Sequence, residues 1–488
     1  MKYALKRFTV KKFISGAALA LAFVLCAASS VPADVPFQGY TYNYWGYMTP
    51  APAAYAPAFV LRGEDAGGFA APADMCVDKN GNLYIMDTGN NRIVVYGPDL
   101  KLSYTVDSFD VNGVKETFNN PNGIFVAQDL NVYVADTDNR RVLAFDSDYN
   151  LLKIIENPKY ETLADNFIFS PLKVCVDKAG RVYAIVKNVY EGIMSFDNSG
   201  DFFGYFGTVK VILDPVRLFW RQFSTEAQKA KQRLFIPTEF LSMDVDADGF
   251  LYTTNTDIVG GNLVKRLNPK GEDVLINFTK QKISGDQAFF IGGSHLTGPS
   301  IFTDVKVRGS GCYTALDSTR GRLYTYDSEG HMLYTTGGIG SIEGMGKKPV
   351  VVDELGEYLL VLDQDMGQVV FLKPTEYGRL INKAVALRYD GDEASAVEEW
   401  KKVLVLNENY ALAYAGIGKA LLVSGENREA MRYLKKGMNV EYYSVAFKRY
   451  RNDMLKANLG AVMTGALLIG LAAAGARTYV KRKSKGGD

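Results

Sequence analysis

One stretch of the chain has the spacing of a calcium-binding loop: "DVDADG", from Asp244 to Gly249. Alternating carboxylates supply the oxygen ligands that Ca²⁺ prefers. A helix–loop–helix calcium loop also needs a bidentate Glu at its twelfth position, however, and this chain has Asn255 there. Similar turns, "DKNG" and "DKAG", occur elsewhere in the chain. We therefore expect a structural turn, and the sequence predicts no metal and no cofactor.

Histidine and cysteine are sparse. The chain has two histidines, His295 and His331, so a zinc centre with three His ligands is impossible, and we expect no acidic ligand pattern beside either one. Cys76, Cys175 and Cys312 lack the close spacing of a metal site or a disulfide framework, which favours buried small hydrophobic residues. The sequence also contains no nucleophile elbow and no phosphate-cradling glycine loop.

Four charged residues remain as candidates for catalysis because they lie on predicted strands that could face a common axis: Asp74, Lys173, Asp304 and Lys306. A calcium-dependent hydrolase or lactonase would place carboxylates in such a position. Charged side chains are, however, mostly solvated or paired with one another. We therefore expect no enzymatic activity, and the calcium-dependent hydrolase or lactonase stays as the alternative.

Two ten-residue stretches are nearly identical: "DTGNNRIVVY" from Asp87 and "DTDNRRVLAF" from Asp136. Each belongs to a longer unit with an alternating strand, a turn, an apolar strand, a polar loop and further strands. Six such units follow one another, with corresponding residues at Asp78, Ala127, Asp177, Asp246, Arg308 and Asp353. Four strands in about 45–50 residues are typical of a propeller blade. The sequence therefore predicts a mostly β protein with a six-bladed β-propeller, closed by an N-terminal strand at 58–62.

The repeated phrase D-x-x-N-x-R has a structural interpretation. Its Asp ends a strand and can accept backbone N–H groups in the following turn, while its Arg can reach back to that carboxylate or to the neighbouring blade. Arg320 takes the place of the Asn in the fifth unit. The residues expected to lock the blades in this way are Asp87, Asn90, Arg92, Asp136, Asn139, Arg141, Asp317 and Arg322.

The units resemble NHL repeats, whose pattern is P-x-G-I-x-V-D-x-x-G-x-x-Y-V-x-D-x-x-N-x-R-I. The first two units match this pattern well and the other four match it in outline. The resemblance covers residues 58–373. It implies a six-bladed propeller that binds partners on one face, although a few members of the family are enzymes.

A second repeat follows, with a helical pattern. Residues 34 positions apart correspond, such as Ala384 with Gly418 and Ala396 with Ala430. Small residues at helix crossings with this period resemble tetratricopeptide (TPR) repeats. The residues expected to pack these helices are Ala384, Ala396, Trp400, Gly418 and Ala430.

Both ends of the chain carry apolar segments. A basic N-terminus followed by the apolar residues 13–28 predicts a signal peptide. Residues 459–476 carry no charge and would span about 27 Å as a helix, enough to cross a bilayer. The predicted organisation is a signal peptide (1–33), an aromatic and Pro-rich leader (34–57), the propeller (58–375, with a helical insertion at about 209–236), two TPR repeats (376–440), a juxtamembrane helix (441–458), a transmembrane helix (459–476) and a basic cytoplasmic tail (477–488).

Two segments are candidates for contact with a partner. The insertion has apolar residues at helical spacing with basic residues between them; there, Trp220 and Arg221 could meet a membrane surface or a partner protein, or the segment could pack as a lid on its own propeller. In the leader, Tyr44 and Trp45 offer aromatic faces that suit a glycan, although a Pro-rich segment can also serve as packing or as a spacer.

The overall charge argues against nucleic acid as a partner, because 55 basic side chains nearly balance 54 acidic ones. The combination of modules resembles bacterial surface NHL proteins that accompany sugar-import genes. We expect an extracytoplasmic scaffold in the cell membrane. A single pass would anchor it, with the N-terminal body outside and the C-terminal tail in the cytoplasm. Its expected partners are proteins, such as transporter or envelope components, or a glycan.

Overall fold

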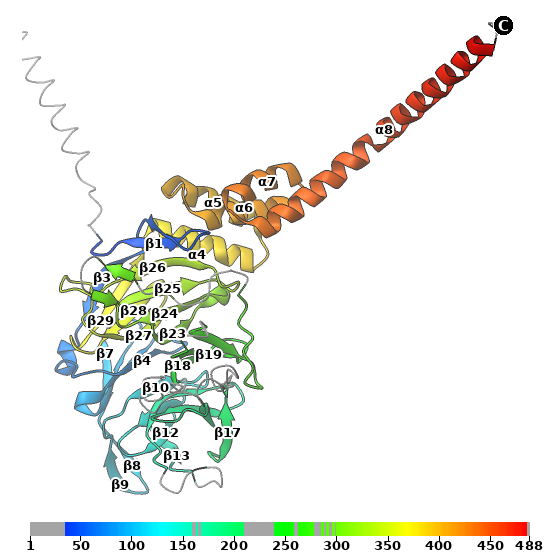
Figure 1. Ribbon diagram of the computed structural model, residues 1–488. Coiled ribbons are helices and arrows are strands. Elements are labelled where there is room, and N and C mark those ends of the chain that lie inside the picture. The colour runs from blue at the N-terminus through cyan, green and yellow to red at the C-terminus, as the bar shows by residue number, and fades with distance from the viewer. Residues whose placement is uncertain are drawn as a thin grey trace, which may run out of the picture.

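The computed structural model describes residues 35–158, 163, 167–208, 239–257, 262–277, 285–286, 289–291, 295–297 and 299–485 (Figure 1). The predicted signal peptide and the predicted helical insertion lie outside the described residues. Trp220 and Arg221, the candidate partner contacts of the insertion, therefore lie outside them too.

Six antiparallel sheets form the blades of a β-propeller, which confirms the predicted fold class. Their strands are β4 (Asp74–Val77), β5 (Leu83–Asp87), β6 (Arg92–Tyr96) and β7 (Leu102–Val106) in blade one; β10 (Gly123–Val126), β11 (Val132–Asp136), β12 (Arg141–Phe145) and β13 (Leu151–Ile155) in blade two; β14 (Pro171–Val176), β15 (Val182–Val186), β16 (Ile193–Phe196) and β17 (Phe202–Phe206) in blade three; β18 (Phe240–Val245), β19 (Leu251–Asn255) and β20 (Val264–Leu267) in blade four; β23 (Phe302–Val307), β24 (Tyr313–Asp317), β25 (Arg322–Tyr326) and β26 (Met332–Gly337) in blade five; and β27 (Pro349–Leu355), β28 (Tyr358–Asp363), β29 (Gln368–Pro374) and β3 (Tyr55–Leu61) in blade six.

The ring is closed by the N-terminal strand, as the sequence predicts. Strand β3 pairs antiparallel with β29, with Val60 opposite Val370 and Phe59 opposite Phe371. Phe59 also stacks on Phe371, with 4.4 Å between the ring centroids. Because β3 comes from the start of the chain and the rest of blade six from the end, this pairing joins the two ends of the propeller.

The second strand of a blade is buried on both faces. In β5, "LYIMD", all five residues are buried, and the same holds for β15 and β24. Each sheet packs between two neighbouring blades, so its central strands are apolar and β-branched or aromatic and do not alternate with polar residues. The turn before β5 is held by Asp78, whose Oδ1 accepts the backbone N–H groups of Asn80 and Asn82 at 2.8 Å each.

In the described part of the chain, three further hairpins and three 3₁₀ turns lie outside the blade sheets. The hairpins are β1 (Gly39–Tyr42) with β2 (Met48–Ala51), β8 (Ser108–Val111) with β9 (Val114–Thr117), and β21 (Phe289–Ile291) with β22 (His295–Thr297); the 3₁₀ turns are η1 (Glu64–Ala66), η2 (Thr88–Asn90) and η3 (Gly309–Gly311). The β1–β2 hairpin packs on β26 of blade five, where Thr335 Oγ1 accepts the N–H of Tyr40 at 3.2 Å and donates to its carbonyl at 3.1 Å.

Helices follow blade six and lie at one end of the propeller (Figure 1). They are α4 (Glu376–Tyr389), α5 (Glu393–Leu406), α6 (Ala411–Val423), α7 (Asn427–Lys436) and α8 (Val440–Lys485). Thr375 and Asp392 cap α4 and α5, each accepting a backbone N–H with its side chain. Gly378 brings α4 close to the propeller, since a Cβ there would lie 2.0 Å from the carbonyl oxygen of Ala54.

The helices and the propeller share one hydrophobic core. Leu316 and Leu333 of blade five, Tyr55 of the closing strand, and Ile381 and Trp400 of the helices belong to a single cluster of buried side chains. The contact between the two predicted modules is therefore part of a hydrophobic core, so neither module is structurally independent of the other.

Helix α8 is long and exposed along most of its length, and it extends away from the rest of the molecule (Figure 1). It is long and apolar enough to cross a membrane, and it runs without a break from the predicted juxtamembrane segment through the predicted transmembrane segment.

Candidate functional site

The repeated phrase builds the same contact in blades one and two. Asp87 Oδ1 accepts the N–H of Ala70 at 2.7 Å, and its Oδ2 accepts from Asn90 Nδ2 at 2.8 Å and Arg92 Nε at 2.7 Å. Asp136 does the same with Asn119, Asn139 and Arg141, at 2.8, 2.9 and 2.9 Å. Both carboxylates are fully buried. These residues therefore hold the ends of strands in place.

Blade five departs from the expected pattern, because the carboxylate of Asp317 binds the guanidinium of Arg320 in place of that of Arg322. Arg320 Nη1 binds Asp317 Oδ2 at 2.9 Å, while Arg322 Nη1 binds Asp286 Oδ2 at 2.8 Å. An arginine in the Asn position is long enough to take over the carboxylate. This releases Arg322 toward a second acidic group, which lies 36 residues earlier in the chain.

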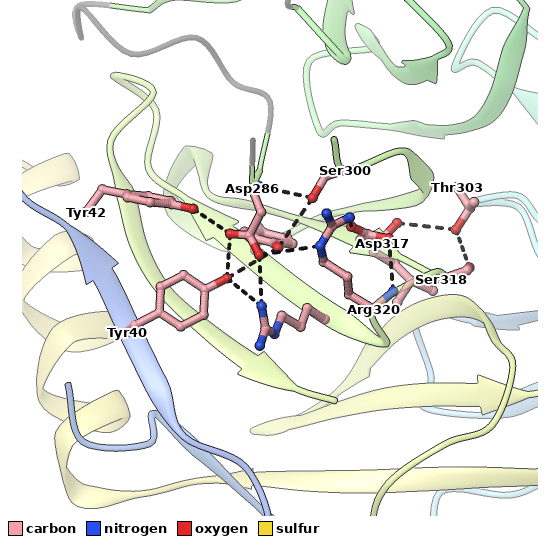
Figure 2. Close-up of polar contacts among 11 residues, drawn as sticks. Tyr40, Tyr42, Asp286, Ser300, Thr303, Asp317, Ser318 and Arg320 are labelled. Carbon is pink, nitrogen blue, oxygen red and sulfur yellow. Dashed lines mark hydrogen bonds and ion pairs between the residues drawn. The ribbon is translucent and has the colours of Figure 1, made fainter. Parts of the chain in front are cut away.

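Asp286 joins the propeller to the N-terminal hairpin (Figure 2). Its Oδ1 accepts from the hydroxyl groups of Tyr40 at 2.6 Å and Tyr42 at 2.5 Å. Burial, reinforced by the charge of Asp286, raises the pKa of both tyrosines far above the ordinary value. Both therefore remain hydrogen-bond donors, and part of the aromatic leader is packing for the propeller.

The tip of the same hairpin is exposed. Between β1 and β2, the side chains of Tyr44, Trp45 and Tyr47 are 36%, 68% and 71% exposed. Tyr44 and Trp45 contact each other edge to face, with 5.0 Å between their ring centroids. The two aromatic residues predicted as partner contacts therefore lie together on the surface.

The first strands of the six blades lie side by side in a closed ring: β4, β10, β14, β18, β23 and β27. At four junctions an Asp accepts a backbone N–H of the following blade; Asp74, Asp304 and Asp353 are buried, and Asp244 is partly buried. Asp74 accepts from Ile124 (2.9 Å), Asp244 from Val307 (2.8 Å), Asp304 from Val352 (2.7 Å) and Asp353 from Val77 (3.0 Å). Each carboxylate thus ties one blade to the next.

Two lysines form ion pairs with three of these carboxylates. Lys173 Nζ lies 2.6 Å from Asp74 Oδ1, and Lys306 Nζ lies 2.9 Å from Asp353 Oδ1 and 3.5 Å from Asp244 Oδ2. The hydroxyl of Ser242 donates to Asp304. The structure therefore gathers all four charged residues that the sequence placed on first strands, together with Asp244 and Asp353, in the inner ring.

Burial and charge pairing act against each other in this ring, and burial prevails at two of its carboxyl groups. Burial raises the pKa of Asp304 and that of Asp353 to about 6, although Lys173 and Lys306, respectively, act in the opposite direction. Burial alone would lower the pKa of Lys306, but Asp244 and Asp353 outweigh it and raise that pKa well above the ordinary value. Carboxyl groups that titrate near neutral pH are typical of functional sites, but also of buried structural ion pairs.

A second group of charges lies where blade five meets the helices. Glu329, in the turn between β25 and β26, receives Arg388 Nη2 of α4 on Oε1 at 2.6 Å and Lys419 Nζ of α6 on Oε2 at 2.8 Å. These cations lower the pKa of Glu329 despite its burial. Nearby, the hydroxyl of Tyr410 donates to the carbonyl of Leu333 at 2.8 Å. We refer to Glu329, Arg388 and Lys419 as the joint clamp.

His331 lies beside this clamp, which corrects the expectation that neither histidine has acidic neighbours. Its Nδ1 is 3.1 Å from Asp327 Oδ2 and 3.6 Å from Glu329 Oε2. The signal was present in the sequence as D-x-E-x-H, in "DSEGH". It was missed because the turn resembles the structural turns of other blades. A cavity of about 190 Å³ adjoins these residues, and Arg388, Trp400 and Lys419 also line it.

The five residues predicted to pack the helices are all buried: Ala384, Ala396, Trp400, Gly418 and Ala430. A Cβ added at Gly418 would lie 2.5 Å from Leu434 Cγ, so a small residue is required at this crossing. Cys76, Cys175 and Cys312 are unpaired and buried, and burial raises the pKa of Cys76 and of Cys312 to about 12.

Comparison with known proteins identifies one part of the chain. An NHL repeat model matches residues 69–96, which contain β4, β5 and β6 of blade one. No curated protein matches the chain. Among solved structures, virginiamycin B lyase from Staphylococcus aureus is similar over 69% of this chain and 88% of its own, at 12% identity and a TM-score of 0.37. A protein of unknown function from Bacteroides thetaiotaomicron is similar over 69% of this chain and 76% of its own, at 10% identity and a TM-score of 0.40. Blade one thus carries an NHL repeat, and the strand pairing establishes the six-bladed propeller that contains it.

Proposed function

We propose that the chain is an extracytoplasmic scaffold that holds a protein or glycan partner at a membrane. The observation that carries this proposal is the shared core between blades five and six and helices α4 to α6, which α7 connects to the long apolar helix α8. A binding body joined firmly to a membrane helix keeps its partner at a fixed place relative to the bilayer.

The proposed orientation rests on the sequence. A basic and apolar leader directs the body across the membrane, and the basic residues after the apolar part of α8 favour the cytoplasm. The 34-residue spacing of the paired helices supports their interpretation as TPR repeats, which are interaction modules.

The inner ring favours a scaffold over an enzyme. Its carboxylates are already engaged by the backbone of the next blade, by lysines or by Ser242. The alternative, a calcium-dependent hydrolase, is supported by the raised pKa of Asp304 and of Asp353. It predicts a calcium-dependent turnover that Asp304→Asn abolishes in a folded protein.

The exposed hairpin tip is the proposed contact with a partner. That partner would be a transporter component or a glycan. The test is affinity purification of the full-length chain from its native membrane in mild detergent, analysed by mass spectrometry and by retention on cell-wall polysaccharide. Trp45→Ala with Tyr47→Ala should lose the partner. Phe203→Ala is the matched control, because Phe203 is 78% exposed on blade three.

Deleting the helices would not be a clean test, because the shared core would be opened. Val405→Asp with Val423→Asp instead changes two side chains of α5 and α6 that are 84% and 76% exposed. If this variant alone lost the partner, the partner would be assigned to the surface of the helices. The scaffold proposal would be contradicted if every variant recovered the same proteins in equal amounts, or if no protein was recovered with any of them.

A further inference from the structure

His331 ends a turn that other blades build without histidine. In the equivalent turns, Asp78 Oδ2 accepts from Asn82 at 2.7 Å and Asp146 Oδ2 from Asn150 at 2.9 Å. Asp327 likewise accepts the N–H groups of residues 329 and 331, at 3.0 and 2.8 Å. An asparagine at position 331 would therefore satisfy the turn, and the turn alone does not account for the imidazole.

Glu329 brings a second carboxylate to the same point. Asp148 holds the corresponding position in the turn of blade two, but that turn ends in Asn150 and has no histidine. One ligand atom each of Asp327, Glu329 and His331 lies within 4.8 Å of the others. Ligand atoms about 3–3.6 Å apart fit around a zinc-sized ion whose bonds are about 2.0–2.2 Å long. The distances from His331 Nδ1 to Asp327 Oδ2 and Glu329 Oε2, 3.1 and 3.6 Å, fall in this range.

The charges around the cavity favour a cation. Asp327, Glu329 and Glu393 carry three negative charges, so these carboxylates outnumber the cations Arg388 and Lys419 by one. The two cations need not leave, because ligating carboxylates are commonly held by outer hydrogen-bond donors. Glu329 already has such donors in the joint clamp.

The cavity itself leaves room beside the three side chains. Its volume is about 190 Å³, enough for several water molecules. Trp400 lines it, and the indole N–H of Trp400 has no acceptor among the described residues. A water molecule in the cavity would supply that acceptor.

We propose that Asp327, Glu329 and His331 form a binding site for a first-row divalent metal ion of the zinc class, at the joint between the propeller and the helices. The mixed oxygen and nitrogen ligands suit such an ion better than Ca²⁺, which takes six to eight oxygen ligands. The site is separate from the inner ring and does not depend on the scaffold function.

The test uses the full-length chain in detergent, free of metal and without a histidine tag, titrated with ZnCl₂ by calorimetry and with CoCl₂ by visible absorption. The matched variant is His331→Asn, which keeps the side-chain donor of the turn as Asn82 does in blade one. His295→Asn removes the other histidine of the chain and serves as the control. Asp327→Asn is a second variant, which retains the acceptor for the backbone of the turn.

We expect one Zn²⁺ per chain and a Co²⁺ spectrum of low coordination number for the wild type and for His295→Asn. Both His331→Asn and Asp327→Asn should bind at least about 10-fold more weakly, while their Tm values without metal stay close to that of the wild type. Absence of saturable binding to the wild type would overturn the proposal. So would equal affinity of His331→Asn and the wild type, which would leave His331 as a lock of the turn.

Discussion

Replacing Lys306 by Met should destabilise the propeller more than any exposed substitution. The ammonium of Lys306 lies between the buried carboxylate of Asp353 and the partly buried carboxylate of Asp244, 2.9 Å from Asp353 Oδ1 and 3.5 Å from Asp244 Oδ2. Methionine keeps most of the volume but leaves both carboxylates without their counter-charge. Removing one partner of a buried ion pair costs about 3–5 kcal/mol, and for a domain of this size that corresponds to a fall in Tm of about 5 °C.

The loss should depend on pH in a defined direction. Burial already raises the pKa of Asp353 to about 6, and removal of the ammonium raises it further. A carboxyl group with a raised pKa in the folded state stabilises the protein when protonated, and this contribution is lost as pH rises through that pKa. Lys306→Met should therefore be least stable relative to the wild type above about pH 7, and should recover part of the difference near pH 5.

The assay is thermal unfolding of the full-length chain in detergent, followed by near-ultraviolet circular dichroism between pH 5 and pH 8. Lys101→Met is the control, because Lys101 forms an exposed ion pair with Asp99 and its loss should leave the Tm almost unchanged. A Lys306→Met variant whose Tm matches that of the control, or whose deficit does not shrink on acidification, would refute the argument that charge pairing holds the inner ring.

Three further predictions concern other buried groups. Tyr55→Phe removes the acceptor of Arg308 Nη2 at 2.9 Å and of Asn382 Nδ2 at 3.0 Å, and should cost about 1–3 kcal/mol in the same unfolding assay; an unchanged Tm would show that water replaces the hydroxyl. Asp304→Asn should make the free energy of unfolding less dependent on pH between pH 4 and pH 7. The Asp304 carboxyl group, with a pKa of about 6, contributes about 3 kcal/mol of stability below pH 4, and this contribution is lost above pH 6. An unchanged pH dependence would contradict that pKa. Cys175 is fully buried and its pKa is raised well above the ordinary value, so iodoacetamide should label it only after unfolding, as mass spectrometry would show.

The propeller was predictable because its constraints are local and repeated. The alternation of strands and turns repeats along the chain, and the extra strand near residue 58 had to pair with a final blade that lacked one. The same logic explains the lock between Asp87 and Arg92, which are five residues apart and meet across a single turn. Contacts of this kind follow from the order of residues in one unit.

The charged contacts outside the repeat were not predictable in the same way. Glu329 meets Arg388 and Lys419, which lie 59 and 90 residues further along the chain, only because the helices fold back onto blade five. Arg322 leaves its expected partner because Arg320 is long enough to occupy it and Asp286 lies near enough to receive it. Each contact depends on the packing of separate units, which no spacing within the sequence encodes.

The inner ring shows why binding is better sought on the outer surfaces of this propeller. Between blades two and three the backbones approach so closely that a Cβ at Gly123 would lie 2.7 Å from the carbonyl oxygen of Leu172, so this position of the ring has no room for a carboxylate. Lys173 instead reaches from blade three to Asp74 of blade one, which already holds the backbone of blade two. Displacing these groups to admit a ligand would uncover buried charges that also join the blades, at a cost of several kcal/mol for each ion. The hairpin tip and the joint with the helices can accept a ligand without that cost, because their residues are exposed in the first case and border an existing cavity in the second.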